Sequence, residues 1–206
     1  MKIGIMGGSF NPIHLGHLMM SEYIREDLDL DRVLFIPTGD APHKEYENVR
    51  DYDRYAMVKL AIEDNPKFFV SDIEMKREGK SYSVDTLNEL KKENPEGEFY
   101  FFLGSDILMD LKKWKKFGDL AKLCTFVCAI RPGFEAISEE VAKNEISYLK
   151  EMYNADVILL HTPRYEISST DLRNRMELDI SVRYLITKPV IQYIKEHDLY
   201  GGYHGI

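Results

Sequence analysis

The chain has 206 residues, which is long enough for one α/β domain with a substantial core. Its net charge of −8 at pH 7 argues against broad nucleic-acid binding, and 44% hydrophobic with 30% charged residues is typical of a soluble globular protein. No apolar run approaches the ~20 residues that cross a bilayer, and MKIGIMGGSF resembles a first strand more than a signal peptide, so we expect a cytoplasmic protein without membrane partners.

Short apolar runs alternate with amphipathic segments along the whole chain. In chain order, the first half predicts a strand at 2–6, a helix at 15–27, a strand at 32–37, a helix near 50–64, and a strand at 67–72. The second half predicts a helix near 83–93, a strand at 98–104 and a broken helical stretch over 105–123. It then predicts a strand at 124–130, a helix near 138–152, a strand at 156–160, and helices from about Ser169 and after Pro189. We expect the C-terminal GGYHGI to be a frayed end.

This alternation predicts an α/β fold, a Rossmann-like doubly wound parallel sheet with helices on both faces. We expect one domain over residues 1–206, with a small helical part from about 168. In the strand order 3-2-1-4-5, which we assume, the ligand crevice lies between the first and fourth strands. The glycine-bearing segments GGSF and GSD follow those two strands.

The loop and helix after the first strand read GGSFNPIHLGHL. Gly7 and Gly8 would let the backbone turn tightly and approach a phosphate, and Ser9 offers a hydroxyl donor. His14 and His17 are three residues apart, so they share a face of the first helical turn, where unpaired N–H groups favour anions.

Other chemistries fit this segment less well. The glycine spacing does not follow G-x-G-x-x-G, and no G-K-[ST] motif follows it, which argues against a dinucleotide-binding or Walker loop. Zinc would need more ligands than the pair His14 and His17, and nothing nearby completes a set. Cys124 and Cys128 lie in an apolar run, which favours buried packing over a disulfide or metal role. We therefore expect no dedicated metal site.

A second motif, ISSTDLR, occupies residues 167–173. Ser169 is a plausible N-cap, so a capped helix with an exposed Arg173 is one interpretation. A helix start with three hydroxyls and an arginine one turn later also suits a polyphosphate. The residues alone leave both interpretations open.

GSFNPIHLGH resembles the signature of the nucleotidyltransferase superfamily, and ISSTDLR resembles its second motif, I-S-S-T-x-[IVL]-R. The resemblance implies that His14 and His17 contact nucleotide phosphates and that the second motif grips the β- and γ-phosphates of ATP. Lys44 and Arg173 join the two histidines as candidates for offsetting negative charge. Mg²⁺ would be bound mainly through ATP phosphates. The ATP-binding residues implied are Gly7, Gly8, Ser9, Phe10, His14, Gly16, His17, Gly104, Asp106, Ile167, Ser168, Ser169, Thr170 and Arg173.

The middle of the chain resembles the bacterial nicotinate mononucleotide adenylyltransferases. The matching pieces are IPTGDAPHK (36–44), RYAMVKLAI (54–62), SYSVDTL (81–87), FLGSD (102–106), Trp114 and RPG (131–133). The mononucleotide-binding residues implied are Lys44, Asp85, Thr86, Asp106, Trp114 and Arg131. Helix capping is the alternative for Asp85, Thr86 and Asp106, and a partly buried ring in a basic helix is the alternative for Trp114.

The resemblance therefore implies transfer of AMP from ATP to nicotinate mononucleotide, in NAD biosynthesis. Nicotinamide mononucleotide or phosphopantetheine is the alternative acceptor, and a non-catalytic nucleotide sensor is the alternative from another class. Asn11 stands where aspartate is frequent in the family, and Ser83 where threonine is frequent. The sequence leaves the oligomeric state open, so a homo-oligomer is compatible with it.

Overall fold

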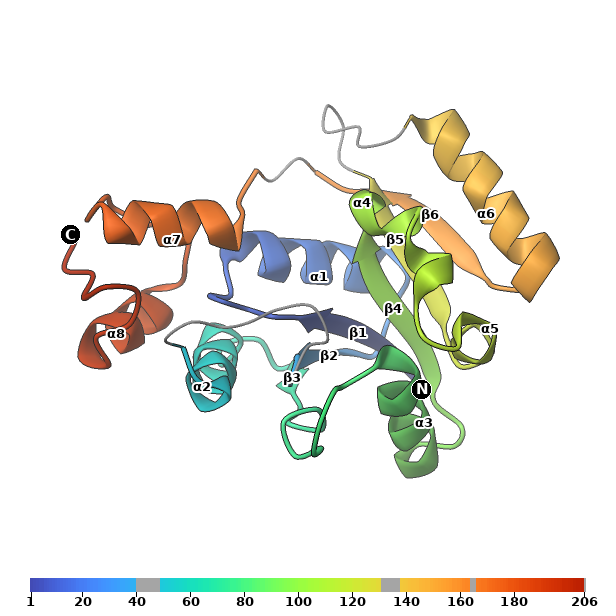
Figure 1. Ribbon diagram of the computed structural model, residues 1–206, viewed down its shortest axis with the longest axis horizontal. Coiled ribbons are helices and arrows are strands. Elements are labelled where there is room, and N and C mark those ends of the chain that lie inside the picture. The colour runs from blue at the N-terminus through green and yellow to red at the C-terminus, as the bar shows by residue number, and fades with distance from the viewer. Residues whose placement is uncertain (40–48, 131–137, 164–165, 206) are drawn as a thin grey trace. The chain divides into compact units, whose positions relative to one another are not determined.

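The computed structural model describes residues 1–39, 49–130, 138–163 and 166–205 (Figure 1). The strands are β1 (Lys2–Gly8), β2 (Arg32–Pro37), β3 (Phe68–Val70), β4 (Glu98–Gly104), β5 (Thr125–Ile130) and β6 (Val157–His161). The α-helices are α1 (Leu15–Asp27), α2 (Asp51–Ala61), α3 (Ser83–Glu93), α4 (Ser105–Leu108), α5 (Phe117–Leu120), α6 (Glu139–Tyr153), α7 (Ser169–Glu177) and α8 (Lys188–Glu196), and a 3₁₀ turn, η1, covers Leu111–Lys113.

The six strands form one sheet in the order β3-β2-β1-β4-β5-β6. The pairs β1/β4, β4/β5 and β5/β6 run parallel, with Gly4 opposite Tyr100 and Gly104 opposite Ala129. This order contains the assumed 3-2-1-4-5 arrangement and confirms the Rossmann-like α/β fold. The strand order reverses between β1 and β4, as a doubly wound sheet requires.

Buried aliphatic and aromatic side chains explain why these runs form strands. Ile3, Ile5, Phe126 and Val127 are all at most 1% exposed, as strands covered by helices should be. Gly4 in β1 allows a close approach, since a Cβ there would lie 2.5 Å from the ring of Phe102. The broken stretch 105–123 resolves into two single-turn α-helices and η1, as the sequence predicts.

The described chain divides into two compact units, each built from separate stretches of sequence. The first contains residues 1–6, 20–33 and 81–164, and in it β5 pairs with β4 on one side and β6 on the other, while α4 packs against β4 and β5. The second contains residues 7–19, 34–80 and 165–206, and in it α2 packs against α8 and β3. None of the described helices is long and apolar enough to cross a membrane.

Candidate active site

The start of α1 holds the paired histidines in a defined geometry. The chain turns at Phe10, which is buried and has φ 47°, and the Asn11–Pro12 peptide bond is cis. The rings of His14 and His17 then stack, with centroids 3.7 Å apart, and the ring of Phe10 meets His17 edge-on at 5.1 Å. The turn therefore presents both imidazoles at the beginning of one helix.

One hydrogen bond selects the tautomer of His17. The backbone N–H of His14 donates to His17 Nδ1 over 3.3 Å, so that nitrogen acts as an acceptor. A neutral imidazole with an accepting Nδ1 carries its proton on Nε2. His17 is partly exposed, whereas His14 is only 6% exposed. His17 Nε2–H is consequently a donor suited to a phosphate oxygen.

The glycines near this turn act differently from the sequence prediction. Gly7 and Gly8 are the last residues of β1 and neither has a positive φ, because Phe10 makes the turn instead. Gly16 gives room to neighbouring side chains: a Cβ there would lie 3.0 Å from His14 Nδ1 and 3.6 Å from Ile167 Cβ. Gly16 therefore makes room for the His14 ring, whereas a Cβ there would make only an ordinary van der Waals contact with Ile167.

The second motif begins α7, and its N-cap is Ser168 rather than Ser169. Ser168 Oγ accepts from the N–H of Asp171 over 3.1 Å. Ser169, one residue too late to cap the helix, instead donates its hydroxyl to the carbonyl of Pro12 over 2.9 Å. The prediction of a capped helix was right, but the capping residue was wrong by one position.

Arg173 links the two motifs a second time. Its Nη1 donates to the carbonyl of Asn11 over 2.8 Å, and its Nη2 donates to Thr170 Oγ1 over 3.2 Å. Residues more than 150 positions apart in the chain are thus hydrogen-bonded to each other. Within the second unit, the structure brings together the histidine pair, the hydroxyl cluster and the guanidinium that the sequence nominated separately.

The sequence did not nominate Arg54, but its guanidinium donates to the backbone just before the histidine pair. Arg54 belongs to the RYAMVKLAI segment and is 0% exposed. Its Nη1 donates to the carbonyl of Ser9 over 2.8 Å, and its Nη2 donates to the carbonyl of Thr38 and to Asp51. Arg54 stands three and four residues before the apolar Met57 and Val58, on the same helix face, and this spacing indicates burial, but its partners could not be read from the chain.

We expect Arg54→Met to destabilise the protein strongly. The substitution leaves the Ser9 and Thr38 carbonyls without this donor, so the free energy of unfolding should fall by about 2–4 kcal/mol. Chemical denaturation measures the loss, and Lys59→Met, an exposed change on the same helix, is the matched control. Equal denaturation midpoints for the two variants would contradict the role of Arg54.

The residues predicted at the exit of β4 lie in the first unit. Gly104 is the N-cap position of α4 and provides no side-chain cap, so capping does not account for Ser105 or Asp106. Asp106 is exposed, and its carboxylate folds back over Gly104, where a Cβ would lie 2.4 Å from Oδ1. Gly104 therefore makes room for the Asp106 carboxylate.

The predicted mononucleotide residues of the same unit gather around α3 and η1. The Trp114 ring packs edge-on against Phe101, with ring centroids 5.7 Å apart. Trp114 is only partly buried, so part of it is exposed. Lys115 lies 3.5 Å from Asp85 and 3.7 Å above the ring of Tyr82. Asp85 does not cap α3, since its N-cap has no side-chain hydrogen bond. A direct ion pair thus joins two segments that the sequence nominated separately.

Three side chains of the same unit already have partners: Lys112 and Lys113 of the KKWKK segment (112–116), and Thr86 of α3. Lys112 donates to Glu145, which is 8% exposed, and this hydrogen bond raises the pKa of Lys112. Lys113 pairs with Asp110, so both lysines that directly precede Trp114 have carboxylate partners. Thr86 is buried and donates to the carbonyl of Tyr82. Lys44 and Arg131 lie outside the described residues.

Both cysteines are buried and neither forms a disulfide. Burial raises the pKa of Cys124 and of Cys128 to about 12, so both are packed thiols, as the sequence predicts. Across residues 1–39, 49–130, 138–163 and 166–205, no group of three or more His, Cys, Asp or Glu side chains could hold a metal ion.

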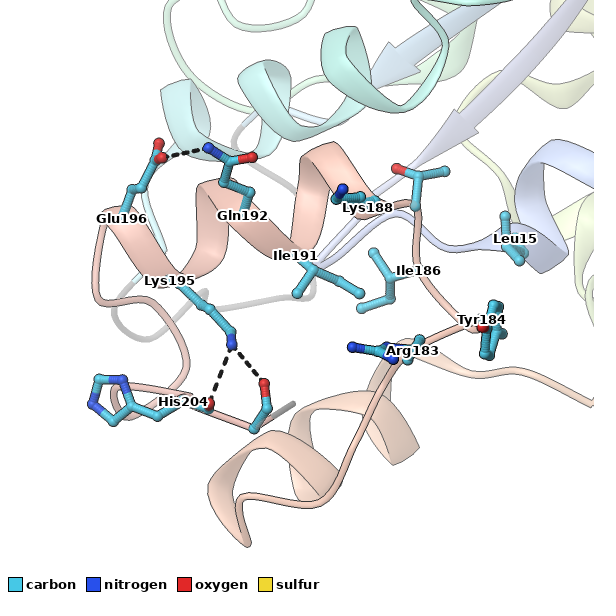
Figure 2. A pocket seen from close by; sticks show the side chains of 12 residues that line it. Leu15, Arg183, Tyr184, Ile186, Lys188, Ile191, Gln192, Lys195, Glu196 and His204 are labelled. Atoms are coloured by element: carbon cyan, nitrogen blue, oxygen red, sulfur yellow. Dashed lines mark hydrogen bonds between the residues drawn. The ribbon is translucent and has the colours of Figure 1, made fainter.

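A pocket of about 880 Å³ lies in the second unit, along α8 and the segment before it (Figure 2). Its walls mix apolar and cationic side chains, including Leu15, Arg183, Ile186, Lys188 and Ile191. Lys195 Nζ donates to the carbonyls of His204 and Gly205 over 3.1 and 2.5 Å; Figure 2 shows Lys195 pointing toward His204. None of the predicted site residues that the structure describes lines this pocket.

Comparison with known proteins now identifies the family. The cytidylyltransferase-like family matches residues 5–175. A probable nicotinate-nucleotide adenylyltransferase of Geotalea uraniireducens is 41% identical over 216 residues, covering 97% of this chain and 98% of the relative. Another, of Desulfitobacterium hafniense, is 42% identical over 202 residues, covering 97% and 95%.

A solved structure shares the fold. Plasmodium falciparum nicotinic acid mononucleotide adenylyltransferase complexed with NaAD matches with a TM-score of 0.78 and 23% identity, over 97% of each chain. The sequence match, far above that identity and nearly complete in length, decides the family. The chain belongs to the cytidylyltransferase-like family and, within it, to the nicotinate-nucleotide adenylyltransferases.

Proposed function

We propose that this nucleotidyltransferase moves AMP from ATP to the phosphate of nicotinate mononucleotide, giving nicotinate adenine dinucleotide and pyrophosphate. The observation that supports it most is the double hydrogen-bonded link between the two helix beginnings, from Ser169 to Pro12 and from Arg173 to Asn11. Each beginning provides N–H and side-chain donors for anions. Their proximity suits a single triphosphate held by both.

The reaction needs no covalent enzyme intermediate. A phosphate oxygen of the mononucleotide attacks the α-phosphorus of ATP in line, and the bond from that phosphorus to the bridging oxygen of pyrophosphate breaks. Catalysis is then mainly positioning and stabilisation of charge on the phosphoryl oxygens. In this proposal His17 donates from Nε2, His14 holds that ring by stacking and by its backbone N–H, and Arg173 offsets charge on the leaving pyrophosphate.

The remaining assignments follow the family resemblance. ATP contacts are proposed at Gly7, Gly8, Ser9, Phe10, Gly16, Gly104, Asp106, Ile167, Ser168, Ser169 and Thr170. Mononucleotide contacts are proposed at Lys44, Asp85, Thr86, Asp106, Trp114 and Arg131. Thr86 is buried, and its backbone N–H and its hydroxyl both donate to the carbonyl of Tyr82, so the contact proposed there requires the hydroxyl to change partner. The exposed part of the Trp114 ring suits stacking on a pyridine ring.

Mg²⁺ is proposed to accompany ATP, bound mainly through its phosphates. The side chains proposed to contact the triphosphate carry imidazole, hydroxyl and guanidinium groups. These groups are better partners for phosphate oxygens than for a hard cation. When bound, the ion would neutralise part of the phosphate charge. Residues 1–206 are proposed to work as one nucleotidyltransferase domain, in the cytoplasm.

The direct test is pyrophosphate release. The protein is incubated with ATP, Mg²⁺ and one candidate acceptor at a time: nicotinate mononucleotide, nicotinamide mononucleotide or phosphopantetheine. Release with a mononucleotide supports the proposal, and mass spectrometry of the product shows that AMP was transferred. Binding of ATP without release for any acceptor would favour a sensor and overturn the proposal.

We expect a higher kcat/KM for nicotinate mononucleotide than for nicotinamide mononucleotide. The acid carries a carboxylate that can accept charge-assisted hydrogen bonds, which the neutral amide cannot match. Steady-state kinetics with both acceptors at saturating ATP measure the ratio. A higher value for the amide would reverse the acceptor assignment while leaving adenylyl transfer in place.

A further inference from the structure

The C-terminal segment, residues 199–205, packs within the second unit, contrary to the frayed end that the sequence predicts. Leu199 and Tyr203 are buried, and Tyr203 Oη accepts from the N–H of Val182 over 3.2 Å. Gly201 and Gly202 have φ of 78° and 73°, a conformation that glycine adopts without strain, and they turn the chain between the two tyrosines. The segment is therefore held in a fixed conformation.

Tyr200 extends from this segment to the turn before α1. Its hydroxyl donates to Asn11 Oδ1 over 2.6 Å, although the two residues are 189 positions apart in the chain. Burial raises the pKa of Tyr200 well above its usual range, so the hydroxyl keeps the proton that it donates. The bond joins a donor that stays protonated to an acceptor that is 8% exposed.

Asn11 consequently accepts hydrogen bonds at both of its oxygens. Tyr200 holds the side-chain amide and Arg173 holds the backbone carbonyl. The next residue, Pro12, has its carbonyl held by Ser169. Asn11 and Pro12 lie only two and three residues before His14, so their orientation sets the direction in which the chain enters α1.

We propose that Tyr200 is a positioning residue for adenylyl transfer: through Asn11, its hydroxyl fixes the turn that presents the His14–His17 pair to ATP. This inference rests on the proposed function. Ser169 and Arg173 also belong to the proposed ATP site: the single hydroxyl donor of Ser169 would be shared between the Pro12 carbonyl and a phosphate oxygen, and the Arg173 guanidinium would bond ATP as well as the turn. Tyr200 is not a proposed ATP ligand, so its bond to Asn11 can hold the turn while ATP binds and leaves.

The test compares two tyrosines with the same substitution. Tyr200→Phe removes only the hydroxyl bonded to Asn11, and Tyr203→Phe removes one in the same segment that is bonded to Val182. We expect kcat to fall about tenfold in Tyr200→Phe, with KM for nicotinate mononucleotide unchanged, because small misplacements of reacting groups lower the rate. Tyr203→Phe should keep the wild-type kcat, although thermal unfolding shifts to lower temperature in both variants.

A double-mutant cycle separates positioning from general loosening of the segment. In an Asn11→Ala background, Tyr200→Phe should cause no further loss of kcat, since its partner is already gone. Additive losses would overturn the proposal, and so would a wild-type kcat in Tyr200→Phe or an equal loss in Tyr203→Phe.

A second readout does not depend on turnover. Imidazole ¹H–¹⁵N spectra report which ring nitrogen of each histidine carries a proton. Tyr200→Phe should reduce the Nε2–H form of His17, because that tautomer depends on the bond from the His14 backbone N–H, and Tyr203→Phe should leave it unchanged. Unchanged spectra in Tyr200→Phe would overturn the positioning role. An inactive wild-type protein would contradict the proposed function alone, and these spectra would still test Tyr200.

Discussion

Replacing His17 with alanine is expected to reduce kcat by about 10²–10³-fold, the range seen when one preorganised donor to a transition-state charge is removed. The structure supplies the reason: the Nδ1 of His17 accepts from the His14 backbone, so Nε2 carries the proton and can donate to a phosphate oxygen. Alanine has no donor at this position, and the stacked partner ring of His14 then lacks its support.

Folding should be almost unaffected in His17→Ala. The side chain is partly exposed, so the free energy of unfolding should change by no more than about 1 kcal/mol. Pyrophosphate release and thermal unfolding are measured on the same preparation, and His161→Ala, an exposed histidine in the other unit, serves as the control. Activity close to wild type in His17→Ala would refute the role of the histidine pair.

The second large effect is expected at Arg173. Arg173→Ala removes a guanidinium proposed to offset charge on the leaving pyrophosphate, together with the bond to the Asn11 carbonyl. We expect kcat/KM for ATP to fall about 10²-fold or more. Arg173→Lys should recover little of it, because an ammonium lacks the planar fork that can bond a carbonyl and a phosphate at the same time.

Arg175 provides the matched control for this prediction. It lies on the same helix, but its guanidinium donates to the carbonyl of Ser181, at 3.2 and 2.8 Å, and is not a proposed ATP ligand. Arg175→Ala should lower the thermal midpoint while kcat/KM for ATP stays near wild type. If both alanine variants lost activity equally, the cause would be weakened packing of α7 rather than phosphate binding.

The pattern of apolar residues predicted most of the fold. The predicted bounds of α1, α3 and β4 agree with the observed ones, because the two helices are long periodic segments and β4 is a mostly apolar run between turn residues. Two strands are shorter than predicted: β3 covers only Phe68–Val70, and β5 starts after Cys124. Strand ends depend on pairing with neighbours, which periodicity does not contain.

The candidate site was predicted in pieces. Residue types and spacing nominated His14, His17 and Arg173, because imidazoles and guanidinium groups at helix starts are recognisable phosphate ligands. The same reasoning misplaced the N-cap by one residue, at Ser169, since adjacent serines are chemically equal and only the entry angle of the chain chooses between them.

By itself, the sequence determined the α/β class and the two motifs of a nucleotidyltransferase, because these depend on local pattern and residue chemistry, whereas the strand order was assumed and the tertiary structure supplied it. The tertiary structure alone decided the contacts between distant residues. These contacts are the bonds of Ser169, Arg173 and Tyr200 to the turn before α1, and the burial of Arg54 beneath it. A hydrogen bond over 189 positions depends on where the whole chain folds, and neither spacing nor composition encodes such a distance.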